Sequence, residues 1–223
     1  THLLFLGARE DEFFRRLAGE SYMEIASKGG GIGKTVSATR AGGSKELQDR
    51  GRQHLELMMR QGTTSVEVKT GYGLSVDGEL AMLAAIDALK RQSPLDIVST
   101  FLGAHAVPAE YRGRPDDFIQ IVVDEMLPAV KQSSSAEFCD VFCEKGAFTV
   151  EQSRRVLRAA MKLGLKLKVH GDELLHSGGS ALAAELKATS VDHCNFASPE
   201  DLQELHNAGT IAVALPATPF FLL

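Results

Sequence analysis

Features that would assign the sequence to a specialised class of protein are missing from it. No apolar run approaches the roughly 20 residues that a helix needs to cross a bilayer, and the first residues lack the charged start and cleavage site of a signal peptide. Three cysteines among 223 residues are too few for a disulfide framework, and an odd number leaves at least one thiol free. These absences predict a cytoplasmic protein that does not enter a membrane.

An excess of positive charge is missing too. The chain carries 24 Lys and Arg against 29 Asp and Glu, a net charge of -5, and the two signs are interspersed. Because no basic stripe is present to neutralise a phosphate backbone, nucleic acid is not an expected partner. Hydrophobic residues, at 44%, are sufficient for the core of one α/β domain spanning residues 1–223.

Strand-like apolar runs alternate with segments of helical period along almost the whole chain. Strands are expected at residues 3–7, 65–70, 96–107, 138–144, 166–170, 190–194 and 210–215. Helices are expected at 44–61, capped by Ser44, and at 77–90, 116–131, 150–163, 179–187 and 199–207. The pattern gives seven strands, or about seven strand–helix units.

Residues 28–35 are rich in glycine and end in Gly-Lys-Thr, as a phosphate-binding loop does. Position 28 is lysine where that motif requires glycine, and no strand precedes the segment. We therefore interpret it as a flexible loop of an active site.

Polar residues and one proline lie at or just beyond one end of the expected strands. They are His2, Tyr72, His105, Glu144, His170, His193 and Pro216. A barrel gathers all its strand ends around one mouth, whereas an open sheet spreads them along a line. The sequence thus predicts an α/β fold, a (β/α)8 TIM-type barrel that is incomplete. Its eighth unit is expected to follow the apolar residues 220–223.

Residues 169–173, Val-His-Gly-Asp-Glu, form the most informative stretch. A neutral imidazole such as that of His170 is a good ligand for zinc, and Glu173 is placed to orient a bound water or take its proton. The next strand ends in His193. Either histidine alone is more often a hydrogen-bonded structural residue, but two on adjacent strand ends favour a metal site.

The predicted metal site also suggests a role for His2. A metal hydrolase of this architecture uses a His-x-His pair at the end of its first strand, because residues i and i+2 of an extended chain point to the same side. His2 would be the second histidine of that pair, and the first would precede the chain. A tag or a frayed end is the alternative explanation of His2.

Several separated motifs resemble those of a known family. They are residues 1–10 (THLLFLGARE), 29–32 (GGGI), 36–40 (VSATR), 69–74 (KTGYGL), 101–105 (FLGAH) and 169–173 (VHGDE). In this order they resemble imidazolonepropionases, metal-dependent hydrolases of histidine degradation in the amidohydrolase superfamily. The resemblance covers essentially the whole chain.

The resemblance implies a mononuclear zinc or iron site with His2 and His170 as ligands. It places His193 beside the metal and its water, and it gives Glu173 the roles of activating that water and binding substrate. Arg9, Tyr72 and His105 would bind the substrate, imidazolonepropionate, with the guanidinium on its carboxylate. Hydrolysis of the ring amide would yield formimidoylglutamate. The family further suggests a homodimer.

Three features of the family are missing from this sequence. The histidine before Thr1, an aspartate from an eighth strand and a small β-rich domain are not found in the sequence. We therefore expect this chain alone to bind metal poorly and to be inactive. Two rival hypotheses stay open: another amidohydrolase, such as a purine or cytosine deaminase, and a non-catalytic barrel fragment or binding module in which the histidines merely pack.

Overall fold

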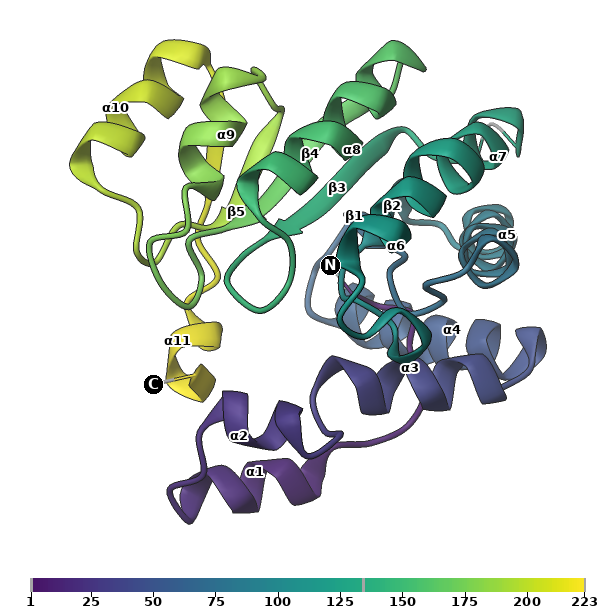
Figure 1. Ribbon diagram of the computed structural model, residues 1–223. Coiled ribbons are helices and arrows are strands. Elements are labelled where there is room, and N and C mark those ends of the chain that lie inside the picture. Colours follow the sequence, from purple (N-terminus) through teal and green to yellow (C-terminus); the bar gives the residue numbers. More distant parts are fainter. Residues whose placement is uncertain (1, 134, 223) are drawn as a thin grey trace.

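The computed structural model of the protein describes residues 2–133 and 135–222. Its centre is a six-stranded parallel sheet with the strands in sequence order (Figure 1). The strands are β1 (Ser65–Lys69), β2 (Asp96–Ala104), β3 (Phe138–Cys143), β4 (Lys166–Gly171), β5 (Ser190–His193) and β6 (Ile211–Val213). Each strand lies next to the one that follows it in the sequence. Because crossover connections between parallel strands are right-handed, each new strand is added on the same side of the last one, and the sheet curves as half of a barrel.

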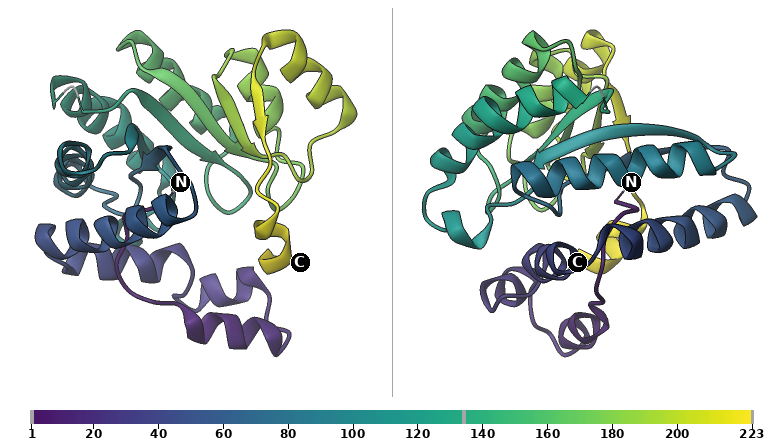
Figure 2. Two further views of the ribbon diagram at one scale, coloured as in Figure 1. Left: turned by 180° about the vertical axis from the view of Figure 1, so that it is seen from behind. Right: turned by 90° about the vertical axis from the view of Figure 1, so that its right-hand side faces the viewer.

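Helices follow the strands and cover the outer face of the sheet. They are α5 (Val76–Gln92), α6 (Pro115–Ile121), the π-helical turn Val122–Met126, α7 (Leu127–Ser133), α8 (Val150–Lys162), α9 (Gly179–Glu185) and α10 (Pro199–Ala208). These helices leave the inner face of the sheet uncovered, as Figure 2 shows from behind. Within the described residues, no helix is both long enough and apolar enough to cross a bilayer.

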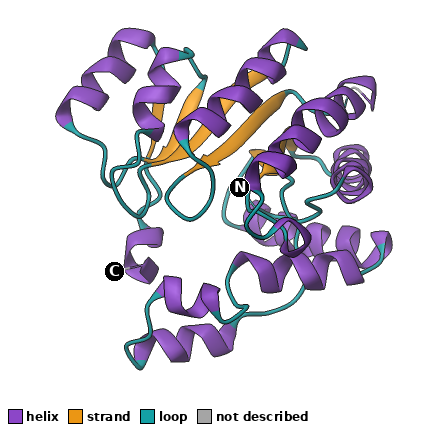
Figure 3. Ribbon diagram, in the orientation of Figure 1, coloured by secondary structure: helices purple, strands orange, loops and turns teal. Residues whose placement is uncertain are grey.

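The remaining helices do not belong to this outer layer. They are α1 (Glu10–Leu17), α2 (Tyr22–Ser27), α3 (Ile32–Ala41), α4 (Ser44–Arg60), the short 3-10 helix Ala109–Tyr111 and α11 (Ala217–Leu222). Helices α1, α2 and α11 lie beyond the carboxyl ends of the strands, on one side of the molecule (Figure 3).

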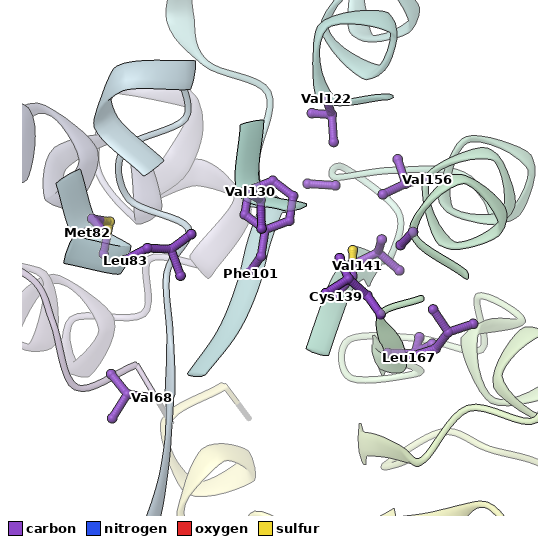
Figure 4. Close-up of a cluster of buried hydrophobic side chains, with 14 of the residues drawn as sticks. Val68, Met82, Leu83, Phe101, Val122, Val130, Cys139, Val141, Val156 and Leu167 are labelled. Atoms are coloured by element: carbon purple, nitrogen blue, oxygen red, sulfur yellow. The ribbon is translucent and has the colours of Figure 1, made fainter. Parts of the chain in front are cut away.

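The strands alternate apolar and polar residues, and the alternation sorts side chains between the two faces of the sheet. Val68, Phe101, Val141 and Leu167 are buried among the helices, against residues such as Met82, Leu83 and Val156 (Figure 4). This packing of apolar side chains between sheet and helices forms the hydrophobic core. The alternate residues of the same strands, mostly polar, face the hollow of the half-barrel.

The expected strand at residues 3–7 is not part of the sheet, and the described residues form six strands instead of the expected seven. Leu3, Leu4 and Leu6 are buried, which explains their strand-like pattern. Side chains from other segments form hydrogen bonds with the backbone of these residues, where a neighbouring strand would do so in a sheet. The Leu6 N–H donates to Thr39 Oγ1 at 3.0 Å, and the Leu3 carbonyl accepts from His54 Nδ1 at 2.8 Å.

Three further expectations need correction. The helix at 44–61 begins after Gly43, and no side chain caps it, so Ser44 is its first residue and not its cap. Part of the glycine-rich segment expected as a loop belongs to α3, where burial of Val36 and Thr39 outweighs the low helix propensity of glycine. The helix expected at 116–131 is interrupted by the π-helical turn Val122–Met126.

Candidate active site at the carboxyl ends of the strands

Five aromatic rings chosen from the sequence gather at one end of the half-barrel. The rings of His2 and His105 stack with centroids 4.6 Å apart, and Tyr72 lies 5.1 Å from His105. His170 is 5.4 Å from His2 on one side and 5.4 Å from His193 on the other. The structure therefore brings together histidines separated by more than 160 positions, as convergence on one barrel mouth requires.

The closest approach within this group is between two ring nitrogens. Nε2 of His2 lies 3.3 Å from Nε2 of His170. Two nitrogens bound tetrahedrally to one zinc ion at about 2.0–2.1 Å would themselves be about 3.3 Å apart. Burial, and then the charges of His105 and His170, lower the pKa of His2, which keeps its ring neutral and its lone pair available. The spacing and the protonation state of these rings thus fit a shared metal ion.

A buried carboxylate on the neighbouring strand stands behind His170. Asp140 Oδ2 lies 3.0 Å from His170 Nδ1, although the ring N–H is not aimed straight at it. The other oxygen, Oδ1, accepts the Val141 N–H at 2.8 Å. A carboxylate behind a metal-binding histidine fixes the tautomer that turns the opposite nitrogen toward the metal. Asp140 was not among the predicted site residues, and its only signal in the sequence is that of an acid inside an apolar strand.

The ammonium group of Lys69 lies at the centre of this acidic layer. Its Nζ is 2.6 Å from Asp140 Oδ2, 3.1 Å from Asp192 Oδ2 and 3.2 Å from Glu67 Oε1. Burial alone would lower the pKa of Lys69, but Asp140, Asp192 and Glu67 together raise it above its ordinary value. Lys69 is therefore a permanent cation on the inner face of the sheet.

Asp140, His170 and Asp192 also place possible metal-ligand atoms within 4.8 Å of one another. The ammonium of Lys69 already contacts both of these carboxylates, so a metal ion bound there would meet an existing positive charge. The space between Nε2 of His2 and Nε2 of His170 has no such competing cation in direct contact among the described residues. We consider it the better metal position.

Glu173 and His193 form a second polar pair beside the first. Glu173 Oε2 lies 3.5 Å from His193 Nε2. Burial raises the pKa of Glu173 to about 7, opposed by the charge of His170 and reinforced by that of Glu144. Burial, and then the charge of His170, lower the pKa of His193 to about 4. At neutral pH His193 is neutral and Glu173 exchanges a proton readily, which suits a carboxylate for acid–base chemistry.

The backbone that carries Glu173 is held by two other acids. Glu144 Oε2 accepts the N–H groups of Glu173 at 2.9 Å and Leu174 at 3.1 Å. Asp172 accepts the N–H groups of Ser177, Gly178 and Ser180 at 2.7–2.9 Å, closing the loop between β4 and α9. These bonds fix the direction in which the loop leaves the strand.

The loop after β1 positions Tyr72 and His105. The buried carboxylate of Glu79 accepts the N–H groups of Gly71, Gly73 and Leu74 at 2.8–3.1 Å. His105 Nδ1 in turn donates to the Gly71 carbonyl at 2.9 Å, which leaves Nε2 as the acceptor nitrogen of a neutral ring. Burial, followed by the charge of His170, lowers the pKa of His105 to about 4.

A cavity of about 470 Å³ opens onto these groups. Its lining includes His2, Lys69, His105, His170, Glu173 and His193. Arg9 is not among its lining residues. That side chain is about one third exposed, and its Nε lies 2.8 Å from Glu12 Oε2 at the start of α1. A second cavity, of about 350 Å³, shares Ile32, His105, Phe142 and Leu174 with the first.

Solved structures with a similar fold include two deaminases. The 5-methylcytosine deaminase from Klebsiella pneumoniae matches 97% of this chain and 52% of its own, with a TM-score of 0.69 and 14% identity. The adenine deaminase from Arthrobacter aurescens matches 82% of this chain and 56% of its own, with a TM-score of 0.60 and 16% identity. At such identities the likeness concerns the fold alone.

Sequence similarity is much higher to another group, although no protein-family model matches the chain. The chain is 51% identical over 223 residues to the imidazolonepropionase of Alkaliphilus metalliredigens and 52% identical over 224 residues to that of Symbiobacterium thermophilum. Each match covers 100% of this chain and 53% of the relative, so the chain spans about half the length of these proteins. Along its whole length, this chain is a relative of the imidazolonepropionases.

Proposed function

We propose that this chain supplies most of the active site of a hydrolase that opens the ring of 4-imidazolone-5-propanoate to give N-formimidoyl-L-glutamate in histidine degradation. The observation that carries the proposal is the 3.3 Å approach of His2 and His170, with Glu173 and His193 beside them. Sequence identity of 51% to an imidazolonepropionase supports the choice of substrate.

His2 and His170 would hold one zinc or iron ion through their Nε2 atoms. Both metals accept imidazole ligands, so these two residues do not discriminate between them. When bound, the metal lowers the pKa of a coordinated water to near 7 and polarises the ring carbonyl. The neutral state of His2 supports this role, because only an unprotonated nitrogen can coordinate.

Glu173 would serve as the acid–base group. As the water oxygen bonds to the ring carbonyl carbon, the carboxylate takes the proton that the water loses. The ring C–N bond then breaks, and the same proton passes from Glu173 to the departing nitrogen. A pKa of about 7 favours both transfers, since the group gains and loses a proton at little cost near neutral pH. His193, 3.5 Å away, would orient the carboxylate and the water.

Tyr72 and His105 would bind the polar edge of the imidazolone ring, and Glu173 would contact it as well. Arg9 would bind the propionate carboxylate. Its guanidinium group is paired with Glu12, so this role requires the substrate carboxylate to replace or share that partner.

The six strands would be part of a (β/α)8 barrel, which the TM-score of 0.69 with a cytosine-type deaminase supports. As a metabolic enzyme acting on a small molecule, the protein would work in the cytoplasm, and a homodimer is the assembly we propose.

The test is a kinetic comparison in a protein that contains this chain at the length of its relatives. Glu173→Gln should lower kcat for the loss of imidazolone absorbance by about 10²–10⁴-fold, the usual contribution of a general base. Glu200→Gln, which alters an exposed acid on α10, should leave kcat unchanged. Wild-type turnover in Glu173→Gln would refute the assignment. Absence of both metal and turnover in the wild type would favour a binding module.

A further inference from the structure

Lys69 has no part in the reaction above, yet it has the most ionic contacts of any buried residue described. We propose that Lys69 is a positioning residue that acts through Asp140. Its ammonium fixes the carboxylate that selects the Nδ1–H tautomer of His170, and this tautomer directs the Nε2 lone pair toward His2. The inference rests on the proposed function only where it treats His170 as a metal ligand.

The contacts around Asp140 leave its carboxylate little freedom. Oδ1 accepts the Val141 N–H at 2.8 Å, and Oδ2 accepts from Lys69 Nζ at 2.6 Å. The same Oδ2 faces His170 Nδ1 at 3.0 Å. Because a carboxylate only accepts hydrogen bonds, the nitrogen facing it is favoured to carry the hydrogen. His170 Nε2 is then left as an acceptor, 3.3 Å from His2.

The position of Lys69 on its strand makes this arrangement specific. Lys69 and Glu67 lie two residues apart on β1 and face the hollow, while Asp140 comes from β3 and Asp192 from β5. A lysine there spans three strands that do not neighbour one another in the sheet. Without its charge, Asp140, Asp192 and Glu67 would repel one another in a buried space, and Asp140 would be free to turn away from His170.

If the ion cluster around Lys69 were purely structural, it would stabilise the fold but would not determine which nitrogen of His170 carries the hydrogen. The tautomer of His170 therefore distinguishes a positioning role of Lys69 from a structural one. The ¹⁵N shifts of the imidazole nitrogens report it directly in the metal-free chain labelled with ¹⁵N-histidine. The spectrum of His170→Gln identifies the signal of His170. His54 and His105, whose Nδ1 atoms face carbonyl oxygens, serve as internal references for the Nδ1–H form.

We expect His170 to be mainly the Nδ1–H tautomer in the wild type. Both Lys69→Met and Asp140→Asn should move its tautomer ratio toward Nε2–H by about tenfold or more, because each variant weakens the attraction between the carboxylate charge of Asp140 and a hydrogen on the facing Nδ1. His54 should keep its shifts in both variants. Lys90→Met, which removes a half-buried lysine bonded to Ser99 at 3.2 Å, is the matched control and should leave His170 unchanged.

Removing a buried cation from among three acids can unfold a protein, so a charge-balanced variant completes the design. Lys69→Gln combined with Glu67→Gln removes one positive and one negative charge and should produce the same tautomer shift. A folded Lys69 variant with the wild-type tautomer ratio would overturn the proposal, as would a wild-type His170 in the Nε2–H form. Neither measurement depends on metal or turnover, so failure of the proposed function would be recognised separately.

Discussion

Asp140 illustrates how one buried carboxylate can control a site without touching the reacting atoms. It contacts His170 and Lys69 and is itself fully buried. Burial alone would raise its pKa, but the charges of His170 and Lys69 hold the pKa of Asp140 well below its ordinary value. The Asp140 carboxylate is therefore negatively charged at neutral pH, in front of the ring of His170.

This arrangement predicts a loss of metal affinity in Asp140→Asn. Removing the partner behind a metal-binding histidine typically costs 10–100-fold in affinity, and we expect a weakening of about that size. Competition between the protein and a chromophoric chelator for Zn²⁺ measures it. Asp117→Asn, at a residue whose side chain is 57% exposed on α6, provides the control. Equal affinities of wild type and Asp140→Asn would show that His170 is not a ligand or that Asp140 does not support it.

The loop between β4 and α9 depends on Asp172 in a comparable way. Its backbone is left-handed, with φ at 53°, and its carboxylate accepts three backbone N–H groups of the loop. Burial would raise the pKa of Asp172, but the Ser180 hydroxyl and these backbone donors together lower it. Asparagine tolerates the same backbone conformation, so Asp172→Asn tests the charge alone.

The sign of the pH dependence follows from that lowered pKa. A carboxyl group that binds its proton more weakly when folded stabilises the protein above the unfolded pKa of about 3.9, and this contribution is lost as pH falls through the folded pKa. Asp172→Asn should therefore lower the free energy of unfolding by about 1.5–3 kcal/mol at pH 7, and by less near pH 3. Urea unfolding at the two pH values measures the difference. If Asp172→Asn lowered the free energy of unfolding by the same amount at pH 7 and at pH 3, the ionised carboxylate would be excluded as the cause.

The sequence predicted some of these segments better than others, and the reason is physical. Helices α8 and α10 matched their patterns closely because capping boxes at Thr149 and Ser198 mark where they start. Residues 3–7 have the pattern of a strand but bond to Thr39 and His54, and a pattern of burial cannot distinguish a strand from a buried extended segment.

The site was predictable to the extent that strand ends could be recognised. His2, His170 and His193 share a strand-end or equivalent position, and each is a residue type with strong chemical meaning, so their convergence could be anticipated from the sequence. Lys69 is the last residue of β1 and Asp140 lies inside β3, and only the folded sheet shows that their side chains meet. The pairing of Arg9 with Glu12 could not be foreseen either, because it depends on the start of α1.

The half-barrel has an exposed edge at β6. Ile211 is 61% and Val213 38% exposed, and the strand pairs only with β5 within the described residues. An unpaired apolar edge strand is a template for association with another chain.

We expect the isolated chain to associate with increasing concentration, and Ile211→Lys to reduce that association. Sedimentation velocity over a range of concentrations measures the change in mean mass. Leu57→Lys, which charges an exposed leucine (59%) on α4 away from the edge, is the control. Identical behaviour of wild type and Ile211→Lys would show that the β6 edge takes no part.

The ionic inner face has a consequence for solvent. Glu67, Lys69, Lys168 and Asp192 all line the 470 Å³ cavity, where a barrel of aliphatic side chains would pack dry. Charged side chains favour water in such a hollow. Removing the water would desolvate ions that only partly neutralise one another, which is energetically costly. The proposed hydrolysis consumes one water in every cycle, and a hydrated chamber beside the histidines would supply it.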